Sequence, residues 1–231
     1  MSKKAKHIGS GIIAFIFLIT AVLVFLPIDT TKKFKINEYR FASDYYIELE
    51  DMPVMSQETD FTCFVVSMAI VRNFFDLETS ENSLLIELEM LNLNEGILPR
   101  EYISYVNKAL DPLSYSVSLI NPKSQTEILN TITESLENGL PVIFFYAAPD
   151  DWKKPEYNTH YGIIYGIDMR NKIVKISNPY GYFEELSFVE LFEGLSFQSF
   201  NKEPFLFHLG RIFGYVKSNN IFVLESFSAG E

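Results

Sequence analysis

The sequence contains few of the residues that build disulfide frameworks or metal sites. Its 231 residues include one cysteine, Cys63, and three histidines, at positions 7, 160 and 208. A single cysteine excludes a disulfide within the chain and says little about the redox compartment. A zinc site needs several histidine or cysteine ligands close together, and no such spacing occurs. We therefore expect neither a metal nor another cofactor.

Basic residues are also scarce outside the N-terminus. Residues 1–35 contain six lysines and one acidic residue, which leaves residues 36–231 with 13 basic and 29 acidic side chains and a net charge of −16. A body with this charge repels nucleic acid and anionic lipid headgroups. The composition thus argues against nucleic acid as a partner.

Charge is absent from residues 8–28, which follow Lys3, Lys4 and Lys6. These 21 residues would span roughly 30 Å as a helix, the thickness of a bilayer core. The alternative is a cleaved signal peptide, but its apolar region should be shorter and should end in small residues. Here the run ends in Phe-Leu-Pro-Ile, without an Ala-x-Ala-like site. We expect residues 1–28 to be an uncleaved single-pass anchor.

Three regions follow from this reading: the anchor, a polar juxtamembrane stalk at residues 29–45, and one α+β domain at residues 46–231. The lysine excess before the apolar run is slight, because lysines also follow it. It favours an N-terminus on the cytoplasmic side of the cell membrane and an extracytoplasmic body. The sequence gives no indication of oligomeric state.

Hydrophobic periodicity divides the body into two halves. Helices are predicted at residues 63–76, 80–92, 99–110, 124–138 and 187–193, and Asp60 and Thr62 offer side-chain oxygens to cap the first. Strands are predicted at residues 45–49, 141–146, 159–167, 172–177, 205–217 and 221–224. Helices first and an antiparallel sheet afterwards indicate an α+β fold.

Cys63 lies where the apolar helical pattern begins, six residues after Gln57. The positive end of a helix dipole favours a thiolate over a thiol. A glutamine just upstream can reach the same point and donate a hydrogen bond to an oxyanion. This combination is typical of a cysteine nucleophile, which also needs a histidine base.

His160 is the best candidate for that base, because it opens a strand directly after a polar loop. Asn178 follows the next predicted strand, and an antiparallel pair of these strands would bring the two side chains within hydrogen-bonding distance. The amide oxygen could then orient the imidazole. His7 lies in the basic N-terminal segment, and His208 lies in an apolar run that favours a core or edge position.

The order of these residues resembles that of papain-like cysteine peptidases, and most of all the bacteriocin-processing (double-glycine leader) peptidase-like group. The resemblance covers roughly residues 50–195. The matching phrases are Gln57-x5-Cys63 entering a helix, Asn94-Glu-Gly-Ile-Leu-Pro99 before another, Gly139-Leu-Pro-Val142 leading a strand, His160-Tyr-Gly-Ile-Ile-x-Gly166 and Asn178-Pro179.

The resemblance implies a papain-like fold preceded by one transmembrane helix, and a thiol-dependent hydrolase that cleaves peptide or other amide bonds. Cys63 would attack as a thiolate, His160 would carry the proton, Asn178 would fix the ring, and Gln57 with the Cys63 N–H would bind the oxyanion. The partners implied are a peptide or protein substrate and the membrane. Phe64 departs from the glycine usual after the cysteine in this group, and Asn178 replaces a common aspartate, although papain itself uses asparagine.

Other interpretations stay open. The Phe64 departure motivates a non-catalytic module that binds a peptide at the membrane surface, and the same thiolate could transfer acyl groups to an amine. Cys63 alone could be a small buried hydrophobe, His160 a hydrogen-bonded strand end, Gln57 a solvated loop amide and Asn178 a turn former.

Overall fold

The computed structural model describes residues 28–29, 44–91, 99–148, 158–197, 202–203 and 205–226. Its helices are α2 (Cys63–Phe74), α3 (Glu81–Glu87), α4 (Pro99–Leu110), the 3-10 turn η1 (Asp111–Leu113), α5 (Gln125–Glu137), α6 (Phe188–Leu195) and α7 (Phe205–Ile212). Its strands are β1 (Ile28–Asp29), β2 (Tyr46–Glu48), β3 (Tyr115–Ile120), β4 (Val142–Ala147), β5 (Thr159–Asp168), β6 (Ile173–Asn178), β7 (Tyr182–Ser187), β8 (Lys202–Glu203) and β9 (Asn220–Ser226).

The predicted anchor and stalk lie outside the described residues, apart from residues 28–29 and 44–45. Within the part of the chain that is described, no helix combines the length and the apolar character needed to cross a bilayer.

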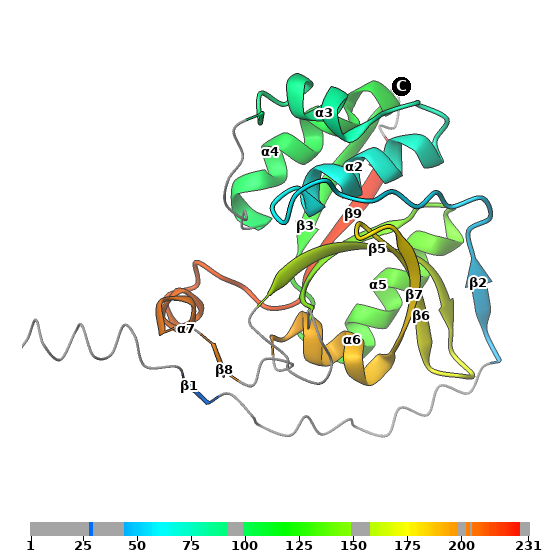
Figure 1. The fold of residues 1–231 in the computed structure, drawn as a ribbon. Coiled ribbons are helices and arrows are strands. Elements are labelled where there is room, and N and C mark those ends of the chain that lie inside the picture. Colours follow the sequence, from blue (N-terminus) through cyan, green and yellow to red (C-terminus); the bar gives the residue numbers. More distant parts are fainter. Residues whose placement is uncertain are drawn as a thin grey trace, which may run out of the picture.

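A seven-stranded antiparallel sheet organises the body (Figure 1). Six strands follow the order β3-β9-β4-β5-β6-β7, and β2 pairs with the far end of the long strand β5. The pairing of β5 with β6 contains an irregularity between Ile164 and Gly166. Because β3 comes from the first half of the body (residues 46–231) and pairs with β9, the sheet joins the two halves of the body into one unit.

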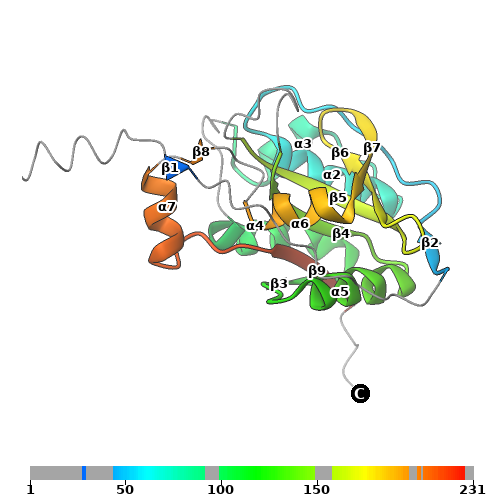
Figure 2. The same ribbon diagram turned by 90° about the horizontal axis from the view of Figure 1, so that it is seen from below.

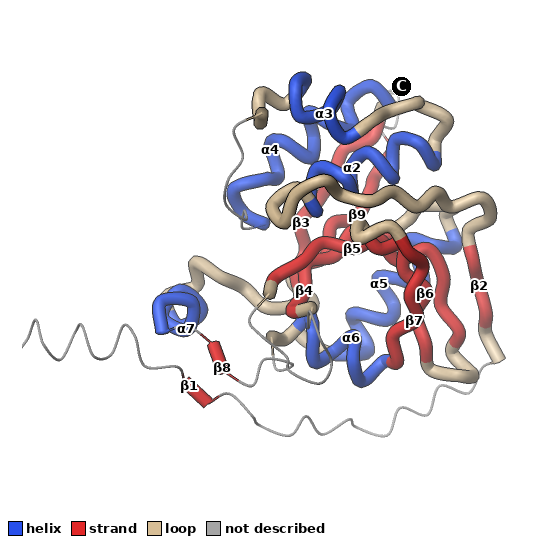
Figure 3. Tube along the Cα trace, in the orientation of Figure 1, coloured by secondary structure: helices blue, strands red, loops and turns tan. Residues whose placement is uncertain are grey.

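Helices cover both faces of this sheet, with α2, α3 and α4 on one side and α5 and α6 on the other (Figures 1 and 3). The strand β4 therefore has no polar face. Its Ile143 and Phe145 pack with α2, whereas Phe144 packs with α5 and α6. Burial of each such side chain contributes about 1.5–3 kcal/mol. Gly162 on β5 leaves room for Phe144, because a Cβ there would lie 2.8 Å from the ring.

Most predicted elements are confirmed, with boundaries that differ by a few residues. The helices α2, α4 and α5 and the strands β2, β4, β5, β6 and β9 all occur where the periodicity places them. Ser124 caps α5 by accepting from the Glu127 N–H. Gly139 adopts φ +74° after this helix, a conformation that glycine permits without steric cost.

Some expectations are wrong. Residues 205–217 are not a strand, because residues 205–212 form the helix α7. Neither predicted cap holds α2: Thr62 is the N-cap residue, but its side chain makes no capping bond and donates to the Thr59 carbonyl. The second helix ends at Glu87 rather than near residue 92. The strands β3 and β7 were not predicted.

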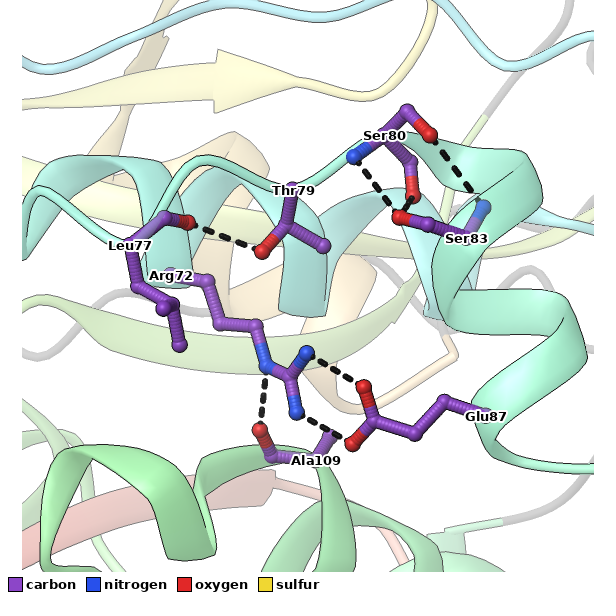
Figure 4. Close-up of polar contacts among 7 residues, drawn as sticks. All are labelled: Arg72, Leu77, Thr79, Ser80, Ser83, Glu87 and Ala109. Atoms are coloured by element: carbon purple, nitrogen blue, oxygen red, sulfur yellow. Dashed lines mark hydrogen bonds and ion pairs between the residues drawn. The ribbon is translucent and has the colours of Figure 1, made fainter.

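A buried arginine joins the three helices above the sheet (Figure 4). Arg72 on α2 is 4% exposed, and its guanidinium donates to both carboxylate oxygens of Glu87 on α3, at 2.7 and 2.5 Å. Its Nε donates to the Ala109 carbonyl on α4, at 2.5 Å. The hydrogen bonds from Arg72, and to a lesser extent its charge, hold the pKa of Glu87 below its ordinary value. This bidentate pair fixes the position of the helix that carries Cys63.

Candidate active site

His160 and Asn178 meet as the sequence predicts. His160 is the second residue of β5 and is 1% exposed, and Asn178 is the last residue of β6 and is 2% exposed. The His160 Nε2 lies 3.0 Å from the Asn178 Oδ1. The predicted hydrogen bond is therefore confirmed, and it is buried.

The other bonds of Asn178 determine which nitrogen of the imidazole carries the proton. The Asn178 Oδ1 also accepts from the Tyr180 backbone N–H, at 2.9 Å, and its Nδ2 donates to the Glu184 carboxylate, at 2.5 Å. These two contacts fix the orientation of the amide, so the oxygen faces His160 and can only accept. Neutral His160 is accordingly protonated on Nε2, and its Nδ1 carries the lone pair that can accept a proton.

Glu184 is the site residue that the sequence analysis missed. It lies on β7 and is partly buried behind Asn178. Burial raises the pKa of the Glu184 carboxyl above its ordinary value, the Asn178 hydrogen bond lowers it, and the charge of Glu190 raises it. The β6–β7 pairing sets Asn178 opposite Tyr182, and Glu184 shares the Tyr182 face of the strand. Only a prediction of β7 could have revealed it.

Tyr180 packs on the imidazole ring. The two rings are almost parallel, at 6°, with centroids 4.3 Å apart, and the Tyr180 hydroxyl accepts from Asn158 Nδ2 at 3.0 Å. On another side, Tyr146 meets the His160 ring edge-on at 6.0 Å. These contacts hold the imidazole in one orientation and shield its bond to Asn178 from water.

Cys63 is the first residue of α2 and is 8% exposed. Its thiol accepts a hydrogen bond from the backbone N–H of Tyr161, the residue after His160 on β5. The helix start and the strand start therefore bring the cysteine beside the residue that follows the histidine. The structure thus places Cys63 in the same region as the His160–Asn178 pair.

The ionisation of Cys63 differs from the expectation of a favoured thiolate. Burial raises the pKa of the Cys63 thiol to about 11, although the N–H groups of Tyr161, Phe64 and Cys63 itself lower it. The helix N-terminus does supply donors to the sulfur, as predicted. Desolvation of the thiolate outweighs them, so the thiol is protonated at neutral pH.

Gln57 approaches the site through its backbone. Its N–H donates to the Pro179 carbonyl at 2.7 Å, and the preceding residue, Ser56, forms a β-bridge with Tyr180. Its side-chain Nε2 donates to the Thr59 carbonyl at 2.8 Å, while Oε1 is buried without a hydrogen-bond partner. The backbone of Gln57 is therefore beside Pro179, whereas its side-chain amide bonds Thr59 and has a second N–H that could donate.

No group of three or more histidine, cysteine, aspartate or glutamate side chains is arranged to hold a metal ion among the residues that the structure describes. Nothing in this part of the chain therefore indicates a metal site.

The sequence pattern of the Peptidase_C39 like family matches residues 49–203, which is more than half of the chain. The chain belongs to this family. The matched region includes Cys63, His160, Asn178 and Glu184. No curated protein matches the chain significantly.

The chain is also similar to solved structures at low sequence identity. A protein described as a C39-like peptidase from Bacillus anthracis is 14% identical with a TM-score of 0.51, over 79% of this chain and 98% of the other. The peptidase domain of Streptococcus ComA, a bifunctional ABC transporter, is 13% identical with a TM-score of 0.44, over 76% and 98%. A double-glycine-motif protease from an AMS/PCAT transporter, solved with its leader peptide, is 11% identical with a TM-score of 0.46, over 78% and 94%. The strand pairing and the first of these structures confirm the predicted α+β fold with an antiparallel sheet, which is consistent with a papain-like C39 peptidase.

Proposed function

We propose that this C39-like protein is a membrane-anchored cysteine peptidase that hydrolyses peptide or other amide bonds through Cys63, His160 and Asn178. The observation that carries the proposal is the fixed His160–Asn178 hydrogen bond, since it leaves Nδ1 as the basic nitrogen of a buried ring. The thiol of Cys63 lies against the next residue on the same strand.

Attack would begin from the neutral pair. The Cys63 thiol transfers its proton to His160 Nδ1 as the sulfur forms a bond to the substrate carbonyl carbon, so the pair needs no free thiolate beforehand. A substrate that covers the site would meet a thiol whose pKa is about 11, which makes the general base essential rather than auxiliary.

The imidazolium formed in this step is stabilised through Asn178. Its Oδ1 accepts the Nε2 proton, and the Glu184 carboxylate accepts from the Asn178 Nδ2 behind it. His160 then donates its new proton to the leaving amine as the carbon–nitrogen bond breaks. Water hydrolyses the resulting thioester, with His160 again acting as the base.

We assign two donors to the oxyanion. The Cys63 N–H is at the start of α2, where backbone N–H groups have no partner within the helix. The Gln57 amide has a second N–H beyond the one bound to Thr59. Loss of one such donor costs about 10²–10³ in rate in other enzymes.

Labelling with an electrophilic cysteine-protease probe, followed by mass spectrometry, tests the proposal. We expect Cys63 to be modified in the wild type and much more slowly in His160→Ala and Asn178→Ala. The control Asn171→Ala, which removes an amide from an exposed turn, should label normally. Equal labelling of His160→Ala and the wild type would refute the activated nucleophile and leave a non-catalytic binding module. Product analysis with added amines separates hydrolysis from acyl transfer.

We also propose that residues 1–28 anchor the protein in the cell membrane, with the body extracytoplasmic and a peptide or protein as substrate. The 21-residue uncharged run supports the anchor. Retention in the membrane fraction after carbonate washing, and digestion of the body by protease added to intact cells, are the expected results. Release by carbonate would refute the anchor.

A further inference from the structure

The most exposed apolar side chains of the described residues lie together at the end of α7. Ile212, Phe213 and Tyr215 are 64%, 70% and 68% exposed, more than any other large apolar side chain in the described part of the chain. They belong to residues 211–217, here named the α7 turn. An exposed apolar group of this kind marks an interaction site.

The α7 turn is held in place rather than frayed. Phe207 on the inner face of α7 meets Phe197 edge-on at 5.2 Å, and Val216 is buried against Gly210. Gly214 adopts φ +74° and reverses the chain, in the manner of a glycine-ended helix. Because Phe207 and Val216 are packed inward, the chain holds Ile212, Phe213 and Tyr215 at the surface.

Basic side chains surround the same turn. Lys123, Arg211 and Lys217 line a cavity of about 710 Å³, and its described lining contains no acidic residue. Both lysines are exposed and form no ion pair with a described residue. This cluster stands out in a body, residues 36–231, whose net charge is −16. It complements an anionic surface.

The chain passes beside the start of α7 directly after its uncharged N-terminal run. The strand β1 pairs with β8, with Ile28 opposite Glu203, and α7 begins at Phe205. Figures 1 and 2 agree in placing β1, β8 and α7 together at one side of the molecule. Since Ile28 is the last residue of the run at residues 8–28, the end of the proposed anchor lies on the same side of the molecule as α7.

We propose that the α7 turn docks on the phospholipid bilayer surface beside the anchor, and this inference depends on the proposed anchor. Its three apolar side chains would enter the headgroup region, and Lys123, Arg211 and Lys217 would contact the lipid phosphates. A second copy of the chain fits less well, because a two-fold contact through the turn would set the basic clusters against each other. Docking would fix the orientation of the peptidase site relative to the membrane.

Depth-dependent quenching of a fluorescent label tests the docking on the full chain. The chain carries Cys63→Ser together with Tyr215→Cys, labelled with bimane, in nanodiscs of phosphatidylcholine and phosphatidylglycerol containing nitroxide-labelled lipid. The matched control is Leu91→Cys, which replaces an apolar residue that is 61% exposed just after α3. We expect lipid quenching at position 215 and none at position 91.

Charge and apolar variants define the contact further. Lys123→Gln and Lys217→Gln should each lower the docked-to-undocked ratio by about fivefold. High salt should also lower this ratio, because it screens the lysine charges. Phe213→Ser should lower it as well. The control Lys172→Gln, which removes an exposed lysine from the turn before β6, should leave the ratio unchanged.

Three outcomes overturn the inference, and each has a separate meaning. Failure of the chain to co-purify with nanodiscs refutes the anchor and with it the docking. Co-purification without lipid quenching at position 215 refutes the docking alone and leaves the anchor in place. Protection of position 215 from aqueous iodide without lipid quenching, in nanodiscs that hold two copies, would identify the turn as a contact between chains.

Discussion

Replacing Glu184 with glutamine removes one charge from behind the candidate triad while preserving the shape of the side chain. The amide oxygen of the introduced glutamine could still accept from the Asn178 Nδ2, so the geometry around His160 should persist. Only the negative charge that faces the imidazolium through Asn178 would be lost. The variant therefore separates electrostatic support from positioning.

The structure sets the size of the effect. Two hydrogen bonds of 3.0 and 2.5 Å and one amide group separate His160 Nε2 from the Glu184 carboxylate, a path of about 8 Å. Unit charges about 8 Å apart interact by about 2 kcal/mol at an effective dielectric constant of about 20. Because Glu184 is partly exposed, solvent screening reduces this to about 1 kcal/mol. We expect kcat/KM of Glu184→Gln to fall by about fivefold.

The pH dependence of kcat/KM tests whether the charge of Glu184 is responsible. Burial raises the pKa of Glu184, so the wild-type carboxylate loses its charge at a higher pH than a solvated glutamate does. The wild type and Glu184→Gln should therefore differ at neutral pH and converge as the pH falls through that raised pKa. The matched control is Glu185→Gln, an exposed neighbour on the opposite face of β7. Equal kcat/KM for Glu184→Gln and Glu185→Gln at neutral pH, with unchanged thermal unfolding, would refute the electrostatic role.

Two further predictions concern the surroundings of the site. Arg72→Met should lower the free energy of unfolding by about 2 kcal/mol in urea titrations, because it leaves the Glu87 carboxylate and a backbone carbonyl without their partner. The pKa of Glu87 is lowered in the folded state. The contribution of the pair to stability is therefore complete above the ordinary glutamate pKa and is lost as the pH falls through the lowered value. A difference in unfolding free energy between variant and wild type that does not shrink in acid would contradict this. Tyr180→Leu should lower kcat/KM by about fivefold through loss of the ring stacked on His160, worth about 1 kcal/mol, while Tyr180→Phe keeps the ring and most of the rate. Equal rates for the leucine and phenylalanine variants would exclude the stacking as the cause.

Sequence periodicity predicts the helices and strands that bury one face or both faces. It does not predict elements such as β7 or α7, where the sequence pattern is absent or fits more than one kind of element. The strand β4 is an unbroken apolar run that needs two covered faces, and the structure supplies both. In β7 the side chains of Tyr182 and Phe183 are both exposed and two glutamates follow them, so no alternation marks it as a strand. Residues 205–212 are a short apolar run that fits a strand as well as a helix. Packing of Phe207 on Phe197 accompanies the helix, and no local pattern reveals such a contact.

The same limit applies to the site. His160 and Asn178 were predictable because each ends a strong strand pattern, and antiparallel pairing then sets the distance between them. Glu184 was hidden because its strand was. The ionisation of Cys63 was misjudged because a helix start is visible in the sequence, whereas the loss of solvent around the sulfur depends on packing by residues far along the chain.

The departure at Phe64 gains a structural explanation from the same packing. Phe64 is 2% exposed, and its ring meets Tyr161 edge-on at 5.3 Å, inside the core between α2 and the sheet. Its backbone N–H still reaches the Cys63 sulfur. The Phe64 side chain therefore points into the core and contacts Tyr161. Phe64 follows the proposed nucleophile Cys63, and Tyr161 follows the proposed base His160. The substitution that motivated a non-catalytic module thus fits equally well with an intact site, and it ties the spacing of α2 and β5 to an aromatic contact.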